Sequence, residues 1–266
     1  MMVWKFVQVK ARMPKMKSPI LVEGLPGIGN VGKVAADFII DEIKATKILE
    51  IFSYDLPNSV FVNEKNLVEL PVIEIYYKKL NGKGHDLLIL TGDVQPTFES
   101  SCYEFCEAVL DKFQEMDGAE IITLGGIGLS QIPKKPLVYC TGNDQKIIDR
   151  YRKGTKINNE LYGVVGPIVG VSGLLLGMSA KRNIPAISLL AETLGHPAYL
   201  GIGGAKEIIK LLDKKLRLKI NLKKLEKEID ELEEELGRVM ESSSGATKSS
   251  KLKKLQSLNK ETSYIG

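Results

Sequence analysis

The sequence predicts an α/β protein, a three-layer α/β/α sandwich with a mostly parallel sheet. Two observations carry this prediction. Continuous apolar runs, typical of strands covered on both faces, alternate along the chain with segments of helical periodicity. Glycine and polar residues follow several of these runs directly, as expected where parallel strands end at one edge of a sheet. A length of 266 residues allows one large core and an appendage.

The chain begins with a predicted edge strand, followed by a strand, a glycine-rich loop and a helix. Alternating apolar residues from Trp4 to Val9 predict the edge strand. The apolar run Ile20–Val22 predicts a buried strand, and Val31–Glu42 predicts a helix. The loop between them is a candidate ligand loop, formed by Gly24, Gly27, Gly29, Gly32 and Lys33.

This loop fits two phosphate-binding patterns. Gly27, Gly29 and Gly32 have the dinucleotide-binding spacing, and Glu50 falls near the position of an acidic ribose ligand. Gly27, Gly32 and Lys33 match the first seven positions of a P-loop, but the eighth is not the Ser or Thr that binds magnesium. The preferred interpretation is that the glycines let a helix start close against the sheet.

The middle of the chain continues the alternation. Asp86–Gly92 is a continuous apolar run that predicts a central strand, and Asn81–Gly84 predicts a hairpin turn before it. A second glycine turn is expected at Gly125–Gly128. Further strands are predicted at Lys47–Phe52, Ser59–Val62, Leu70–Tyr77, Glu120–Leu124, Leu137–Cys140 and Ala186–Ala191, and helices at Phe98–Met116, Asp144–Arg152, Gly166–Asn183 and Gly204–Leu212.

Any cleft is expected at the carboxyl edge of the sheet. The best acid–base group there is His196 with Glu192 and Asp93, because all three follow predicted strands. Ser172, within GVSG, lacks the preceding strand that a nucleophile elbow needs. No nucleophile is evident beside the group, so we assign no catalytic residue and expect no cofactor.

Composition and charge favour a cytoplasmic protein that binds neither nucleic acid nor a membrane. The net charge of +4 belongs to residues 242–266, which hold five lysines and one glutamate, so residues 1–241 are neutral overall. A nucleic-acid-binding fold would carry a basic face. The three cysteines and two histidines form no metal-ligand spacing, and we interpret the cysteines as core residues. The sequence has no apolar run long enough to span a bilayer.

A heptad pattern follows the α/β part and divides the chain into residues 1–215, 216–240 and 241–266. It predicts an amphipathic helix whose narrow apolar seam needs a partner. That partner is either the same subunit or a second subunit. The seam consists of Leu218, Leu222, Leu225, Ile229, Leu232 and Leu236.

The last segment is predicted to be a flexible basic tail. Residues 242–250 are small and polar, with too little apolar surface to fold. The tail then carries a leucine stripe and an aromatic end, a composition that suits a tethered peptide ligand. Its candidate partner-binding residues are Leu258, Tyr264, Ile265 and Gly266.

Five segments, in this order, resemble the proteasome assembly chaperone family, in its archaeal homo-oligomeric branch. They are VEGLPGIGNVGKVAADFII, SYDLPNSVFV, DLLILTGDVQP, TLGGIG and GPIVGVSGLLLGMSAKRNIPAISLLAET. The resemblance implies a three-layer fold without established catalysis that binds proteasome α subunits through a mobile C-terminal segment. It also implies a homo-oligomer, with a tetramer favoured. Related tails carry a penultimate tyrosine, whereas Tyr264 is third from the end.

Two hypotheses therefore remain. The first is a non-enzymatic protein that engages the proteasome α-ring through its tail. The alternative is a nucleotide- or small-molecule-binding α/β enzyme that uses the Gly24–Gly32 loop.

Overall fold

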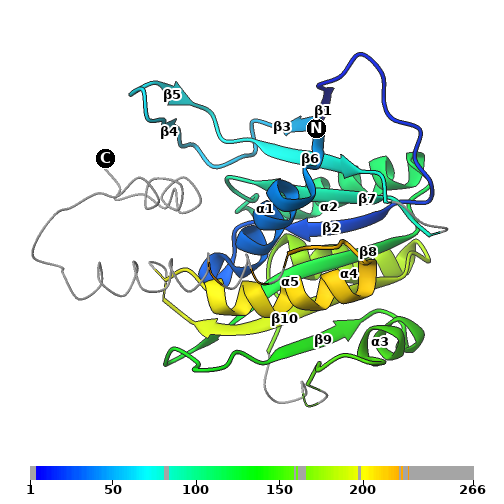
Figure 1. The fold of residues 1–266 in the computed structure, drawn as a ribbon. Helices are drawn as coiled ribbons and strands as arrows, with labels where there is room; N and C mark the ends of the chain where they lie inside the picture. Colours follow the sequence, from blue (N-terminus) through cyan, green and yellow to red (C-terminus); the bar gives the residue numbers. More distant parts are fainter. Residues whose placement is uncertain are drawn as a thin grey trace, which may run out of the picture.

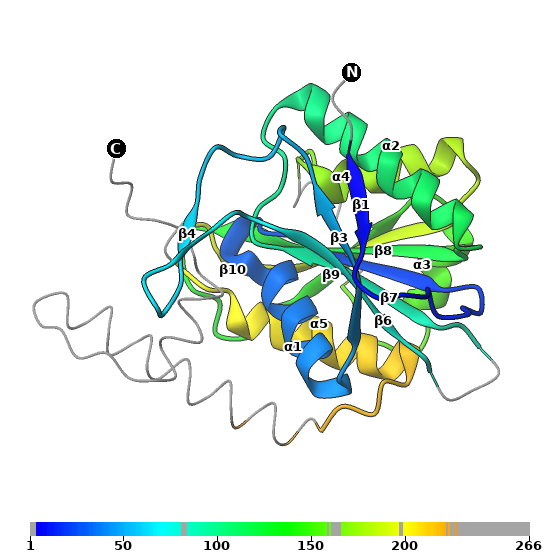
Figure 2. The ribbon, with the colours of Figure 1, turned by 90° about the horizontal axis from the view of Figure 1, so that it is seen from above.

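The computed structural model describes residues 4–80, 84–158, 160, 166–196, 199–221, 223 and 227. It confirms the α/β prediction, with an eight-stranded sheet between two helical layers (Figure 2). The strands, in their order across the sheet, are β1 (Lys5–Gln8), β3 (Thr46–Phe52), β6 (Ile73–Lys78), β7 (Leu87–Gly92), β2 (Ile20–Gly24), β8 (Glu120–Leu129), β10 (Ala186–Leu194) and β9 (Val138–Gly142).

The sheet is parallel only in its centre. β7, β2, β8 and β10 pair in parallel, whereas β1, β3 and β6 on one flank and β9 on the other pair antiparallel to their neighbours. Parallel neighbours need a crossover of a dozen or more residues. Only eight residues connect β6 to β7, and eight connect β8 to β9, so these chain reversals make the flanks antiparallel.

Helices cover both faces of the sheet (Figure 1). α1 (Val31–Ile43) and α5 (Ile202–Leu216) pack against one face, and α2 (Glu99–Glu115) and α4 (Val171–Lys181) pack against the other. The short helix α3 (Gln145–Arg152) lies beside β9. Among the described residues, no helix is both long enough and apolar enough to cross a bilayer.

Two apolar clusters, one on each face, hold the layers together. On the α2 and α4 face, the fully buried Phe105 meets the ring of Trp4 edge-on, with centroids 4.7 Å apart. Burying one such side chain stabilises a fold by roughly 1.5–3 kcal/mol. Cys102, Cys106 and Cys140 are buried free thiols, so their predicted place in the core is confirmed. Burial also raises the pKa of the Cys106 thiol, which keeps it protonated.

Three sequence predictions for this part of the chain were wrong in detail. Gly125–Gly128 forms no turn, because β8 continues through these residues and pairs with β10 as far as Leu129. The helix expected from Gly166 begins only at Val171, after Gly170 adopts a φ of +85° that a helix does not allow. The last helix begins at Ile202, two residues before the predicted start at Gly204, and extends to Leu216.

An arm, defined as residues 54–70, projects from the sheet between β3 and β6 (Figure 1). It contains a small two-stranded sheet formed by β4 (Phe61–Val62) and β5 (Val68–Glu69). Asn63 shapes the turn between them, because its Oδ1 accepts hydrogen bonds from the backbone N–H groups of Lys65 (2.9 Å) and Leu67 (3.0 Å). The sequence predicted a strand at Ser59–Val62 but not its partner β5.

Candidate functional site at the carboxyl edge of the sheet

The candidate site lies where the parallel strands end. The helix after β2, α1, covers one face of the sheet, and the helix after β7, α2, covers the other. β2 and β7 are parallel neighbours, and the chain leaves β2 toward one face of the sheet and β7 toward the other face. In open α/β sheets, ligands bind in the crevice at such a switch point. The residues to inspect therefore follow β2 and β7.

Gln95 bridges this switch point. Its Nε2 donates a 2.6 Å hydrogen bond to the carbonyl of Pro26, which follows β2. Its Oε1 accepts a 3.2 Å hydrogen bond from the backbone N–H of Val171, the first residue of α4. A Cβ at Gly170 would lie only 2.7 Å from the same Oε1, so the close approach requires glycine. One amide side chain thus joins the β2 loop to the start of α4.

A buried acid lies beside this bridge. Glu23, on β2, has no exposed surface, and its Oε1 accepts a 3.0 Å hydrogen bond from the backbone N–H of Leu25. Its Oε2 accepts a 2.8 Å hydrogen bond from the hydroxyl of Ser172. Burial raises the pKa of the Glu23 carboxyl to about 7, and the two hydrogen bonds oppose that rise. The sequence pattern did not single out Glu23, because an acidic residue directly after an apolar run is typical of the point where a strand passes into an exposed loop.

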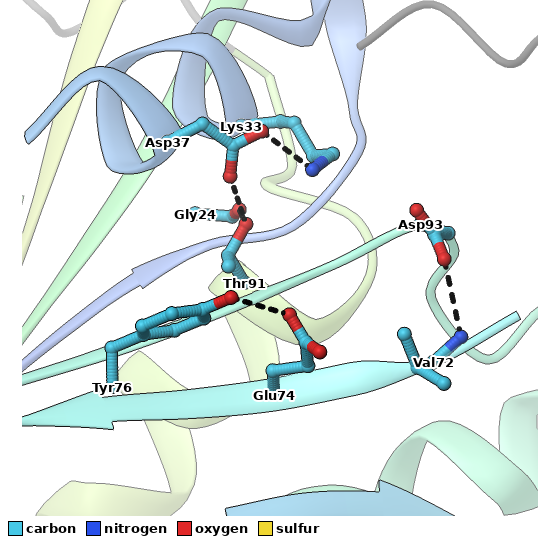
Figure 3. Close-up of polar contacts among 8 residues, drawn as sticks. All are labelled: Gly24, Lys33, Asp37, Val72, Glu74, Tyr76, Thr91 and Asp93. Atoms are coloured by element: carbon cyan, nitrogen blue, oxygen red, sulfur yellow. Dashed lines mark hydrogen bonds and ion pairs between the residues drawn. The ribbon is translucent and has the colours of Figure 1, made fainter. Parts of the chain in front are cut away.

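Lys33 of the candidate ligand loop already has an anionic partner. Its Nζ lies 2.6 Å from Asp37 Oδ2, one helical turn along α1. Asp37 Oδ1 accepts a 2.8 Å hydrogen bond from the Thr91 hydroxyl, which also approaches the Gly24 carbonyl at 3.2 Å (Figure 3). Burial raises the pKa of Asp37, and the Lys33 cation opposes the rise. This chain of contacts ties α1 to β2 and β7.

Three glycines of the loop are packed against other backbone or side-chain atoms. A Cβ at Gly24 would lie 2.3 Å from the Gly32 carbonyl, and one at Gly32 would lie 2.5 Å from the Leu124 carbonyl. Gly29 has a φ of +60° and would place a Cβ 2.6 Å from Thr193 Oγ1. These contacts support the packing interpretation, in which α1 begins close against the sheet.

Gly27 differs from its neighbours, because a Cβ there would have no atom within 4 Å. Its backbone is extended, a conformation open to any residue. Gly27 therefore offers a substitution that probes the loop without disturbing its packing. Ligand binding by the loop stays a prediction.

Two members of the expected acid–base group, Asp93 and Glu192, lie on separate strands. Asp93 follows β7, and its Oδ2 accepts a 3.3 Å hydrogen bond from the backbone N–H of Val72 (Figure 3). Glu192, on β10, accepts hydrogen bonds from Leu137 N–H (2.9 Å) and the Tyr139 hydroxyl (3.0 Å). β2 and β8 separate the two strands, so about 14 Å lies between them. Asp93 and Glu192 are therefore too far apart to act on one substrate atom, and the role of His196 with Glu192 stays a prediction.

The described residues contain no cluster of three or more His, Cys, Asp or Glu side chains that could hold a metal ion. The polar groups named above meet other protein groups at this edge. The arrangement fastens loops to the sheet and offers no matched acid, base and nucleophile among them.

Leu218 is the one seam residue within the described ranges. α5 ends at Leu216, Arg217 adopts a left-handed φ of 54°, and Leu218 follows in non-helical backbone. Leu218 packs in the apolar cluster of its own α1 and α5 face, as the same-subunit alternative expected, but its backbone is not helical as predicted. The other seam residues and the candidate tail residues lie outside the described residues and stay predictions: Leu222, Leu225, Ile229, Leu232, Leu236, Leu258, Tyr264, Ile265 and Gly266.

Residues 21–240, most of the chain, match the model of the PAC2 family. The chain belongs to the PAC2 family. An uncharacterized protein of Methanocaldococcus jannaschii is 30% identical to this PAC2 chain over 240 residues, covering 89% of it and 91% of the relative.

Two solved structures of proteins from Pyrococcus furiosus have the same fold. PbaB, described as an archaeal proteasome activator, is 35% identical, with a TM-score of 0.78, and the match covers 89% of this chain and 98% of PbaB. PbaA, described as an archaeal homolog of proteasome-assembly chaperone, is 25% identical, with a TM-score of 0.70, and the match covers 89% and 92%. The resemblance predicted from the sequence is confirmed.

Proposed function

We propose that this PAC2 protein is a non-enzymatic binding protein of the proteasome, which engages the α-ring through its C-terminal tail as a homo-oligomer. The similarity to PbaB carries the proposal, because 35% identity extends over 98% of that proteasome activator. PbaA, an archaeal homolog of proteasome-assembly chaperone, supports the same class of partner.

The geometry of the sheet edge agrees with a binding role. Gln95 bridges the switch point, Lys33 is paired with Asp37, and the carboxylates of Asp93 and Glu192 serve different loops. Such contacts make a rigid platform, and a rigid platform that presents several weak tails gains avidity toward a ring-shaped target.

Activation and assembly are separate roles for such a protein. Activation is favoured by the higher identity to PbaB, and assembly by the similarity to PbaA. The two roles are distinguished by adding the protein to mature proteasomes, where an activator increases peptide hydrolysis, and to free α subunits, where an assembly factor increases the yield of rings.

The central experiment removes the tail. The full chain and a chain truncated after Met240 are immobilised, and binding of purified archaeal α-rings is measured by interferometry. We expect truncation to weaken binding at least about tenfold through lost avidity. A Tyr264→Ala variant should reproduce much of this loss, whereas Ser263→Ala, one residue away, should bind like the full chain. Unchanged affinity after truncation would remove the tail from the mechanism.

The alternative, a nucleotide-binding enzyme, is tested by calorimetric titration of the full chain with NAD and ATP. Gly27→Ala is the matched variant, because the added methyl meets no neighbouring atom and yet stands in the loop. Lys33→Ala removes the only lysine of the P-loop pattern. Tight binding of NAD or ATP that both substitutions abolish would establish the loop as a ligand site. A titration of the full chain that releases or absorbs no heat would favour the proteasome-binding hypothesis.

A further inference from the structure

The arm presents four exposed aliphatic side chains, Val60, Val62, Val68 and Leu70. Val62 pairs with Val68 across β4 and β5, so both side chains stand on the same face of the small sheet. Val60 and Leu70 flank the two strands, and the period-2 alternation, extended by one residue beyond each strand, places them on the same side. All four are 50–68% exposed. Phe61, which points to the opposite face, is buried.

This face has the character of an interface. Two-stranded ribbons are marginally stable alone, and aliphatic residues on both strands gain stability only when a partner covers them. Further exposed apolar residues lie at the same edge of the sheet, including Phe98 before α2 and Val169 before α4, which are 70% and 84% exposed. Val62 and Val68, paired across the ribbon, form an exposed apolar patch, and such patches mark interaction sites on soluble proteins.

A complementary surface lies at the other end of the same edge. The β8–β9 connection, residues 130–137, presents the exposed apolar side chains of Ile132 and Leu137 together with Lys134 and Lys135. Its net charge is +2, whereas the arm carries three acidic residues and one lysine, a net charge of −2. Both surfaces are therefore apolar, and their charges are opposite.

The arm and this connection leave each other exposed within one protomer, since Val62, Val68 and Ile132 are all open to solvent. β3 and β6, which flank the arm, lie four and three strand positions from β8 and six and five from β9, a separation of roughly 14–29 Å. Figure 1 shows the arm at one end of the carboxyl edge and the β8–β9 connection at the other. Contact of two arms with each other would bring like charges together, which disfavours a two-fold arm–arm dimer.

We propose that the aliphatic face of the arm docks on the β8–β9 connection of a second copy of this chain, in a head-to-tail contact. Heterologous contacts of this kind close into rings when the rotation between copies allows it. The inference rests on the homo-oligomeric state proposed above and places the contact between copies at the carboxyl edge of the sheet. A ring would present one C-terminal tail per subunit to a ring-shaped partner.

The first test measures the mass of the full chain by light scattering after size-exclusion chromatography. Val62→Asp/Val68→Asp places two charges on the docking face, and we expect the mass to fall to that of one chain, 29.4 kDa. Val7→Asp is the control, because Val7 is an equally exposed valine on the edge strand β1 and lies outside both surfaces. An oligomer that survives the double substitution with its mass unchanged would overturn the proposal.

Charge reversal keeps the proposal falsifiable if the double aspartate variant does not fold. Lys134→Glu/Lys135→Glu should raise the dissociation constant of the oligomer at least about tenfold at low salt. Adding Glu64→Lys/Glu69→Lys on the arm should restore the mass, because the swapped charges are again opposite. Failure of this rescue, with both charge-reversed chains folded by circular dichroism, would contradict the pairing.

Cysteine cross-linking separates the head-to-tail contact from an arm–arm dimer. Chains carrying Val68→Cys are mixed with chains carrying Ile132→Cys and oxidised. The head-to-tail contact predicts a covalent dimer only in the mixture, whereas an arm–arm dimer predicts one with Val68→Cys alone. The native cysteines are buried, which limits their interference.

Failure here is distinguishable from failure of the proposed function. Binding of a synthetic tail peptide, residues 242–266, to α-rings can be measured without the rest of the chain, so the result does not depend on the oligomeric mass. A native oligomer whose peptide fails to bind would refute the tail mechanism and leave the arm contact standing.

Discussion

The Ser172 hydroxyl donates a 2.8 Å hydrogen bond to Oε2 of Glu23, which joins the first turn of α4 to the end of β2. The carboxyl it meets is fully buried, and its pKa is raised from 4.5 to about 7. Between these two values, the folded protein keeps a proton that the unfolded chain has released. The free energy of unfolding therefore falls as the pH rises through this window.

Replacing Glu23 tests this dependence. Glu23→Gln removes the ionisation while keeping an acceptor for Leu25 N–H and a partner for Ser172. We expect the variant to lose the decline between pH 4.5 and about 7, and to exceed the native protein by up to about 3 kcal/mol at higher pH. Urea unfolding at several pH values measures the difference. Equal slopes for both proteins would show that Glu23 titrates normally.

Two helical glycines should respond to alanine in opposite directions. At Gly32, in α1, a methyl group would lie 2.5 Å from the Leu124 carbonyl, a backbone atom that cannot move away alone. We expect Gly32→Ala to lower the free energy of unfolding by about 2 kcal/mol or more. At Gly177, in α4, a methyl group meets nothing within 4 Å. Gly177→Ala should raise stability by roughly 0.5–1 kcal/mol, since alanine is the better helix former.

Thermal and urea unfolding of the two variants measure both signs in one experiment. A Gly32→Ala protein as stable as the native one would mean that α1 can move off β8, and would weaken the packing interpretation of the glycine loop. A destabilising Gly177→Ala would mean that this face of α4 is covered by a partner.

The Lys33–Asp37 pair should show strong coupling. Its side chains are only 10% and 21% exposed, and the atoms lie 2.6 Å apart. Lys33→Met leaves a buried carboxyl without its cation, and we expect a loss of about 3 kcal/mol. The Lys33→Met/Asp37→Asn double variant should recover part of that loss, because neither charge is then stranded. A double-mutant cycle by urea unfolding measures the coupling, and additive effects would contradict it.

Periodicity alone predicted the layers of this fold. The strands β2, β7, β8 and β10 are parallel, and helices cover both faces of the sheet that they form. Their sequences are therefore largely apolar and do not alternate between apolar and polar residues. The antiparallel flanks were missed because strand direction depends on the connection. Gly125–Gly128 was misjudged as a turn, since glycine marks a close approach of chains as readily as a reversal. There, a Cβ at Gly126 would lie 2.2 Å from the Ile28 carbonyl.

The site was harder to predict than the fold. Asp93 follows β7 and Glu192 lies near the end of β10, but the distance between them depends on strand order, which local patterns do not contain. β5 was not predicted, because a strand of two residues is too short to show an alternating pattern. The alternation of Val60 and Val62 with Val68 and Leu70, on either side of an asparagine-rich turn, is the signal that could have found the arm.

The heptad seam yields the last prediction, which separates packing within a subunit from pairing between subunits. Leu218, at the start of the pattern, is buried in the core of its own α/β part. Its Leu218→Ala variant should lose about 2–3 kcal/mol of unfolding free energy without a change in oligomeric mass. We expect Leu225→Ala/Leu232→Ala to leave the mass unchanged as well, because the inferred contact between copies uses the arm and the β8–β9 connection. Light scattering gives the mass and urea unfolding the stability. If the mass of the Leu225→Ala/Leu232→Ala chain falls while its α/β part stays folded, the seam pairs subunits, and the arm contact is then insufficient to hold the oligomer by itself.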